Sequence, residues 1–171
     1  MSDRDDEDGM SSQLEFGWRA HTAQESWTAK VDVKASVLLA AQVGLLVAIA
    51  TIASASGFKH PEGLWAALLP VGVLLILGGS IFSASAIYPQ LSSDPGKTSD
   101  LIYFGHLRNL TGEEVQKRLK DLSEEAQLSA LSRQLVKMSE VNWSKHVRLR
   151  RSIWATAAGA AFAVLGMIMS F

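Results

Sequence analysis

ASVLLAAQVGLLVAIATIASAS, the stretch from Ala35 to Ser56, contains no ionisable side chain. As an α-helix it would be about 33 Å long, which is enough to cross the hydrocarbon core of a bilayer. Two further uncharged runs occupy residues 64–88 and 153–171. None of the three shows the polar stripe of a helix in a soluble protein, and only helices satisfy the backbone hydrogen bonds of such runs in lipid. The sequence therefore predicts an all-α integral membrane protein with three transmembrane helices.

The segments outside these spans are polar. Residues 1–10 are rich in acids and are expected to form a disordered tail, and residues 11–34 are expected to form a helical segment that leads into the first span. Residues 57–63 are predicted to be a short external loop. Residues 89–152 are predicted to form a helical cytoplasmic segment between spans two and three.

Local signals predict where helices begin and end. Thr111 and Glu114 have the spacing of a capping box, and Ser123 precedes two glutamates in the manner of a helix start. From Glu124 no proline or glycine interrupts the chain before Gly159, so a helix of roughly 48 residues is expected to continue into the third span. Pro70 is expected to kink the second span.

The basic residues predict the orientation. Fifteen of the 16 lysines and arginines precede the first span or lie between the second and third, and only Lys59 lies between the first and second. The positive-inside rule therefore predicts a cytoplasmic N-terminus and an external C-terminus. Residues expected at the membrane surface, where the basic ones would contact anionic lipid headgroups, are Trp27, Lys30, Lys34, Lys145, Arg148, Arg150 and Arg151.

No residue pattern points to catalysis. The chain has no cysteine, which excludes thiolate nucleophiles and thiolate metal sites. The four histidines show no metal-ligand spacing and are expected to be solvated, and the paired glutamates fall at predicted helix starts. The sequence therefore predicts a protein that is not an enzyme, without a catalytic residue, a metal site or a cofactor.

Small residues recur at four-residue spacing in two spans, where they let helix backbones approach closely within one subunit or between subunits. They are Ala40, Gly44 and Ala48 in the first span and Ala155, Gly159 and Ala163 in the third. Gln42 is expected to form a hydrogen bond between helices, with a pore-lining role as the alternative. A stripe of Leu128, Leu131, Leu135 and Met138 needs an apolar partner, which could be the helix that begins at Thr111, the N-terminal helix or a second copy. Assembly into a homo-oligomer is expected.

The segment DLIYFGHLR, residues 100–108, places an acid, two aromatic rings and an arginine close together. Two interpretations remain open. The segment could bind a nucleotide, with Asp100 nearby, the base stacked on Tyr103 or Phe104, and Arg108 on the phosphate. It could instead be a hydrophobic plug that packs on neighbouring helices.

Three stretches together resemble a known family. WTAKVDVKAS before the first span, DLIYFG after the second and the approach to the third span at Lys145 are similar to the transmembrane effector of Pycsar antiphage defence, over roughly residue 26 to the C-terminus. The resemblance implies a bacterial inner-membrane effector that a cyclic pyrimidine nucleotide, cCMP or cUMP, activates. A partner pyrimidine nucleotide cyclase would make this messenger, and the effector would then impair the membrane and cause abortive infection. The family transfers no ligand residues to this chain, and no nucleic acid partner is expected.

Two other functions fit the same residues. One is a ligand-independent permeabiliser that resembles phage holins, although a holin hardly needs the long segment at residues 89–152. The other is a non-catalytic membrane anchor or assembly subunit. Toxicity of the expressed protein with and without a cyclase would separate these possibilities.

Overall fold

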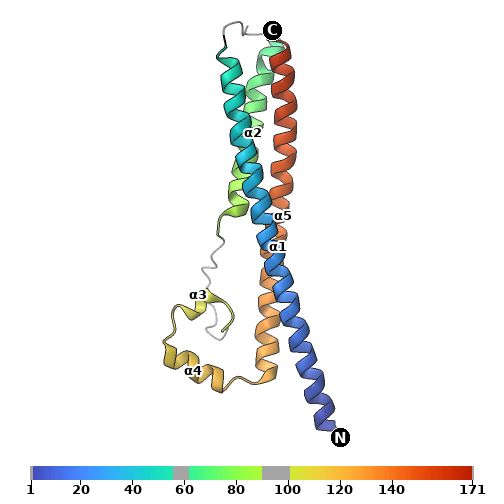
Figure 1. Ribbon diagram of the computed structural model, residues 1–171, viewed down its shortest axis with the longest axis vertical. Helices are drawn as coiled ribbons and strands as arrows, with labels where there is room; N and C mark the ends of the chain where they lie inside the picture. Colours follow the sequence, from blue (N-terminus) through green and yellow to red (C-terminus); the bar gives the residue numbers. More distant parts are fainter. Residues whose placement is uncertain (1, 56–61, 90–100, 171) are drawn as a thin grey trace. The chain divides into compact units, whose positions relative to one another are not determined.

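The computed structural model describes residues 2–55, 62–89 and 101–170, which are mostly helical and contain no strands. The helices are α1 (Ser2–Ala53), the 3-10 helix η1 (Gly63–Ala67), α2 (Leu68–Ile87), α3 (Phe104–Leu107), α4 (Gly112–Lys120) and α5 (Glu124–Ile168) (Figure 1). Parts of α1, of η1 with α2, and of α5 are long and apolar enough to cross a membrane. The prediction of an all-α protein with three membrane-spanning helices is confirmed.

The chain divides into two compact units. The spanning unit consists of Ala29–Tyr88 and Trp143–Phe171, and the polar unit consists of Met1–Thr28 and Pro89–Asn142. Both α1 and α5 contribute to each unit, whereas α2 belongs to the spanning unit and α3 and α4 belong to the polar unit.

Glycines bring α2 and α5 into close contact in the spanning unit. A Cβ atom added to Gly159 would lie 2.7 Å from the carbonyl oxygen of Gly72, and one added to Gly72 would lie 2.6 Å from the backbone nitrogen of Ala163. Only glycine permits backbones to approach so closely. The helix α1 joins this pair through two apolar clusters, Val31 and Ala35 with Ala86 and Leu149, and Ile49 with Ile76 and Ala163.

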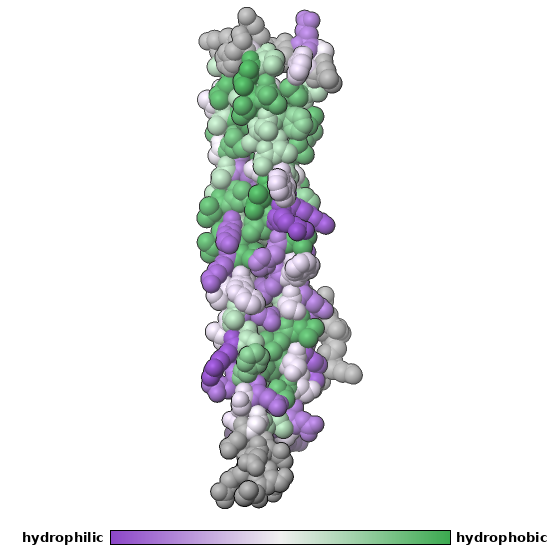
Figure 2. Space-filling model, turned by 90° about the vertical axis from the view of Figure 1, so that its right-hand side faces the viewer, coloured by the Kyte–Doolittle hydropathy of each residue, from purple (hydrophilic) through white to green (hydrophobic). Residues whose placement is uncertain are grey.

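Large apolar side chains cover the outside of the spanning unit. Figure 2 shows hydrophobic residues over much of one face of it. In a protein surrounded by water such a surface would be a large unsatisfied patch, whereas lipid accepts it. The exposed side chains include Val37, Val43 and Val47 on α1, Leu74 and Ile81 on α2, and Ile153, Trp154, Val164, Leu165 and Ile168 on α5.

Pro70, which was expected to kink the second span, lies close to its start. The chain changes from 3-10 to α-helix at Leu68, which places Pro70 in the first turn of α2. Backbone N–H groups of a first helical turn have no intrahelical acceptor, so the missing N–H of proline removes no helical hydrogen bond there.

The predicted helix starts are confirmed. The Thr111 backbone N–H donates to Glu114 Oε2 at 2.7 Å, and the Glu114 N–H donates to Thr111 Oγ1 at 3.3 Å. The bond from the Thr111 backbone is the main reason why the pKa of the Glu114 carboxyl lies below its ordinary value. At the start of α5, the Ala126 N–H donates to Ser123 Oγ at 3.2 Å, and the helix then runs for 45 residues without a break.

The first helix begins earlier than the sequence predicted. It starts at Ser2, so the structure describes helix where residues 1–10 were expected to be a disordered tail. No proline lies in this stretch to stop the helix. Once a helix has formed, each added residue gains a hydrogen bond and fixes the backbone dihedral angles of only one residue, so extension is easier than initiation.

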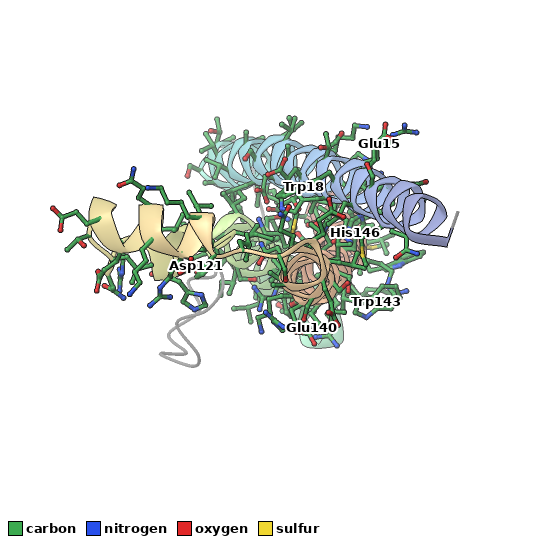
Figure 3. The ribbon with its side chains drawn as sticks, turned by 90° about the horizontal axis from the view of Figure 1, so that it is seen from below. Glu15, Trp18, Asp121, Glu140, Trp143 and His146 are labelled. Carbon is green, nitrogen blue, oxygen red and sulfur yellow. The ribbon has the colours of Figure 1, made fainter. Side chains whose placement is uncertain are left out.

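In the polar unit, the N-terminal half of α1 packs against the beginning of α5. Leu131 is fully buried, and a Cβ added to Gly17 would lie 2.5 Å from its Cδ2 atom. Of the three partners considered for the leucine stripe, the structure therefore places the N-terminal helix against Leu131. The outer surfaces of the two helices carry Glu15 and Glu140, which are exposed (Figure 3).

Leu131→Ala is expected to destabilise the polar unit by about 2 kcal/mol, because the change opens a cavity in a buried contact beside an open groove. Hydrogen–deuterium exchange should become faster in residues 12–28 and 124–142 and stay unchanged in residues 68–87. Leu119→Ala on α4 is the matched control, since the Leu119 side chain is 55% exposed. Equal effects of the two changes would contradict the packing of Leu131.

Candidate functional site

A group of polar side chains lies inside the spanning unit, where all three of its long helices meet. Gln42 of α1, Ser83 of α2 and Ser152 of α5 are each fully buried. Gln42 Nε2 donates to Ser152 Oγ at 2.9 Å and to Thr156 Oγ1 at 2.5 Å. We call Gln42, Gly79, Ser83, Ser152 and Thr156 the polar cluster. The prediction that Gln42 forms a hydrogen bond between helices is confirmed.

The directions of these hydrogen bonds follow from the hydroxyl groups. Ser152 Oγ donates to the Gly79 carbonyl at 2.7 Å, and Thr156 Oγ1 donates to the Ser152 carbonyl at 2.8 Å. Each hydroxyl has one proton, so both can only accept from Gln42, and Ser83 must donate in its 2.7 Å contact with Ser152. The amide nitrogen of Gln42 therefore faces the two hydroxyls of α5.

This arrangement leaves the other end of the Gln42 amide without a partner. Gln42 Oε1 is buried and accepts no hydrogen bond from any described residue. A buried acceptor without a partner costs about 1–3 kcal/mol. Gly79 makes the cluster possible, since a Cβ there would lie 2.7 Å from Thr156 Oγ1.

Sequence reasoning missed the other members of the cluster. Ser152 was placed just outside the third span, and Ser83 and Thr156 were not singled out. The signal was present as four-residue spacing: Gly79 with Ser83, and Ser152 with Thr156, each share one face of a helix.

An ion pair lies nearer one end of the spanning unit. Lys145 Nζ lies 2.5 Å from Asp32 Oδ1, with the Lys145 side chain 7% exposed and that of Asp32 34% exposed. Arg148 donates to the Ser85 carbonyl at 2.7 Å. Lys145 and Ser152 are seven residues apart, so both point to the inner face of α5.

This geometry corrects the expectation that Lys145 and Arg148 contact lipid headgroups. Lys145 is buried and paired with an acid that was not predicted as its partner, and Arg148 is half-buried against a carbonyl. The other five predicted surface residues are exposed, as a headgroup contact would require: Trp27, Lys30, Lys34, Arg150 and Arg151.

The two stripes of small residues differ in their surroundings. Gly159 and Ala163 are buried against α2, and Ala155 is half-buried. Ala40, Gly44 and Ala48 are exposed, and nothing lies within 4 Å of a Cβ added to Gly44. The packing face of α1 instead carries Val31, Ala35, Gln42 and Ile49.

The predicted nucleotide segment lies at and around α3. Asp100 is outside the described residues, and only the backbone of Phe104 is described. The ring of Tyr103 packs over Gly105 and meets the ring of His106 edge to face, with the centroids 5.2 Å apart. Arg108 is exposed.

Two histidines differ from the expectation that all are solvated. His106 Nδ1 is buried and has no hydrogen-bond partner among the described residues. His21 has a side chain that is 13% exposed, and its ring packs edge to face on that of Trp18. Among the residues that the structure describes, no three His, Asp or Glu side chains gather as metal ligands.

A groove of about 490 Å³ lies beside the leucine stripe of the polar unit. Its walls come from both helices of the unit and are mostly apolar, so the groove offers little that would recognise a charged ligand. The lining residues are Ser12, Gln13, Phe16, Gly17, Leu128, Leu131, Ser132 and Leu135.

Comparison with known protein families gives one match. A family model described as the Pycsar effector protein domain matches residues 16–170, which include most of both units. Searches of curated proteins and of solved structures found no match. The resemblance seen in the sequence is thus confirmed over almost the whole chain. The chain belongs to the Pycsar effector family and is a transmembrane effector of antiphage defence.

Proposed function

We propose that a cyclic pyrimidine nucleotide, cCMP or cUMP, activates this effector, which then impairs the bacterial inner membrane and causes abortive infection. A partner pyrimidine nucleotide cyclase supplies the messenger. The family match over residues 16–170 carries this proposal, because it includes the membrane-spanning helices together with the polar unit that would sense the messenger. The distribution of basic residues supports a cytoplasmic polar unit and N-terminus, with the C-terminus external.

The segment around α3 is the proposed messenger site. The ring of Tyr103 packs over Gly105, and an aromatic ring of this kind can stack on a pyrimidine. Arg108 is exposed and would meet the cyclic phosphate, and Asp100 and Phe104 complete the segment by their positions in the sequence.

The outer face of α1 is the proposed contact between subunits. Ala40, Gly44 and Ala48 leave that face shallow, so a helix of a second copy can approach its backbone. A homo-oligomer of this kind has the closed symmetry common among assemblies of identical chains.

Arg108→Ala should weaken messenger binding about 10- to 100-fold, because a charged hydrogen bond to phosphate contributes about 1.5–3 kcal/mol. Calorimetric titration of the purified full-length protein with cCMP and with cUMP measures this effect. Arg108→Lys keeps the charge and should lose less, and Lys120→Ala on α4 is the control for a general loss of positive charge. Unchanged binding by the Arg108→Ala variant would remove Arg108 from the site.

The activity is tested by growth. Cells that express the effector should stop growing only when an active pyrimidine cyclase is also present. Growth arrest without the cyclase would favour a holin-like permeabiliser instead. No arrest in either case would favour a passive anchor or assembly subunit.

A further inference from the structure

We propose that the polar cluster is the closed form of a water-filled path for small ions, and that this path opens when α1 separates from α2 and α5. The inference rests on the proposed function and specifies how the membrane is impaired. It assigns damage to a defined hydrophilic path rather than to a general disruption of the bilayer.

The distribution of side chains on α5 is the first observation. Its buried face between residues 145 and 166 is polar or small at nearly every position, with Lys145, Ser152, Gly159, Ala163 and Gly166 buried and Leu149 as the large apolar exception. Large apolar side chains such as Ile153, Trp154 and Ile168 point outward. Helix packing in lipid does not require hydroxyls and an amide at its centre, since small apolar residues suffice.

The unpartnered oxygen of Gln42 is the second observation. In the closed arrangement Gln42 Oε1 is buried without a hydrogen bond, although the nitrogen of the same amide bonds to two hydroxyls. Water would satisfy this acceptor as soon as the helices part. The cluster therefore reduces the free-energy difference between the closed arrangement and a hydrated one.

The contacts indicate which helix moves. The helices α2 and α5 touch through their backbones at Gly72 and Gly159, a contact that loses much of its packing when the helices separate. In contrast, α1 meets α5 through side chains: the amide of Gln42, the ion pair of Asp32 with Lys145, and the apolar contacts of the clusters that contain Leu149 and Ala163. Movement of α1 exposes the hydroxyls of Ser83, Ser152 and Thr156 together.

The lining suits small monovalent ions. Its ligands are hydroxyl, amide and carbonyl oxygens without net charge, which can replace part of the hydration shell of such an ion. In the closed arrangement the polar atoms lie 2.5–2.9 Å apart, in direct hydrogen-bond contact.

The absence of cysteine allows a direct test. Full-length Ser152→Cys protein in liposomes is treated with a charged, membrane-impermeant thiol reagent, with and without cCMP or cUMP. Labelling should become at least tenfold faster with the messenger that triggers K⁺ release, and labelling should reduce that release. Ile153→Cys is the matched control, because Ile153 lies at the same depth on α5 but is 49% exposed on the outer face, and it should not react.

Ser83→Cys on α2 repeats the test should the first variant fail to fold. The path is overturned if the messenger triggers K⁺ release but the reagent labels neither Ser152→Cys nor Ser83→Cys. It is also overturned if Ile153→Cys is labelled as fast as Ser152→Cys. Release of a large fluorescent dextran together with K⁺ overturns it as well, because a narrow path excludes the dextran. No release with either nucleotide would instead overturn the proposed function, and this inference with it.

Discussion

Asp32→Asn is expected to lower the free energy of unfolding of the spanning unit by about 3 kcal/mol, because it leaves the buried ammonium of Lys145 without a counter-charge. The value lies at the lower end of the range for broken buried pairs since Asp32 is 34% exposed. Titration with sodium dodecyl sulfate in mixed micelles, followed by circular dichroism, measures the change.

Two comparisons isolate the charge. The double change of Asp32→Asn with Lys145→Met should recover much of the lost stability, because a neutral pair needs no desolvated counter-charge. Glu140→Gln breaks the exposed pair of Glu140 with Lys137, whose side chains are both 61% exposed, and should cost less than about 0.5 kcal/mol. Equal destabilisation by Asp32→Asn and Glu140→Gln would show that the buried ion pair contributes no more to stability than an exposed one.

Gly79→Val is expected to destabilise the spanning unit by about 3 kcal/mol. Its Cβ would lie 2.7 Å from Thr156 Oγ1, 3.1 Å from Gln42 Nε2 and 3.2 Å from the Ser152 carbonyl, so the polar cluster must separate to admit it. The same detergent titration measures the loss. Gly78→Val is the neighbouring control, because nothing lies within 4 Å of a Cβ there and the change should alter stability by less than about 1 kcal/mol. Similar losses for both glycines would contradict the close packing at Gly79.

The spans and helix ends could be predicted from the sequence because each depends on local chemistry. A run such as residues 35–56 is too apolar to be stable in water. In the capping box, the side chains of Thr111 and Glu114 accept hydrogen bonds from backbone N–H groups within the same four residues. The unbroken α5 follows likewise from its lack of proline and early glycine.

The inward face of α1 could not be predicted in the same way, because hydropathy is nearly uniform around a spanning helix. The sequence suggested two packing faces for α1, that of Ala40 and Gly44 and that of Gln42, and the structure buries the face of Gln42. Positions two apart on a helix point about 200° apart, so burying Gln42 turns both of its small neighbours outward. A hydrogen-bonding side chain needs a partner in lipid, and an alanine does not.

The position of Lys145 shows a related limit. The positive-inside rule counts charges near a span but does not say on which side of a helix each one lies. Whether Lys145 meets lipid or Asp32 depends on the rotation of α5, and that rotation is set by contacts of Ser152 and Gly159 with residues far away in the sequence.

The polar inner face of α5 also bears on how the protein is made. Among the three spanning segments, that of α5 is the least hydrophobic. If α5 were alone in a membrane, the side chains of Ser152 and Thr156 would face hydrocarbon. In the folded protein Gln42 and Ser83 are their hydrogen-bond partners. These partners belong to α1 and α2, which precede α5 in the chain and are therefore synthesised before it.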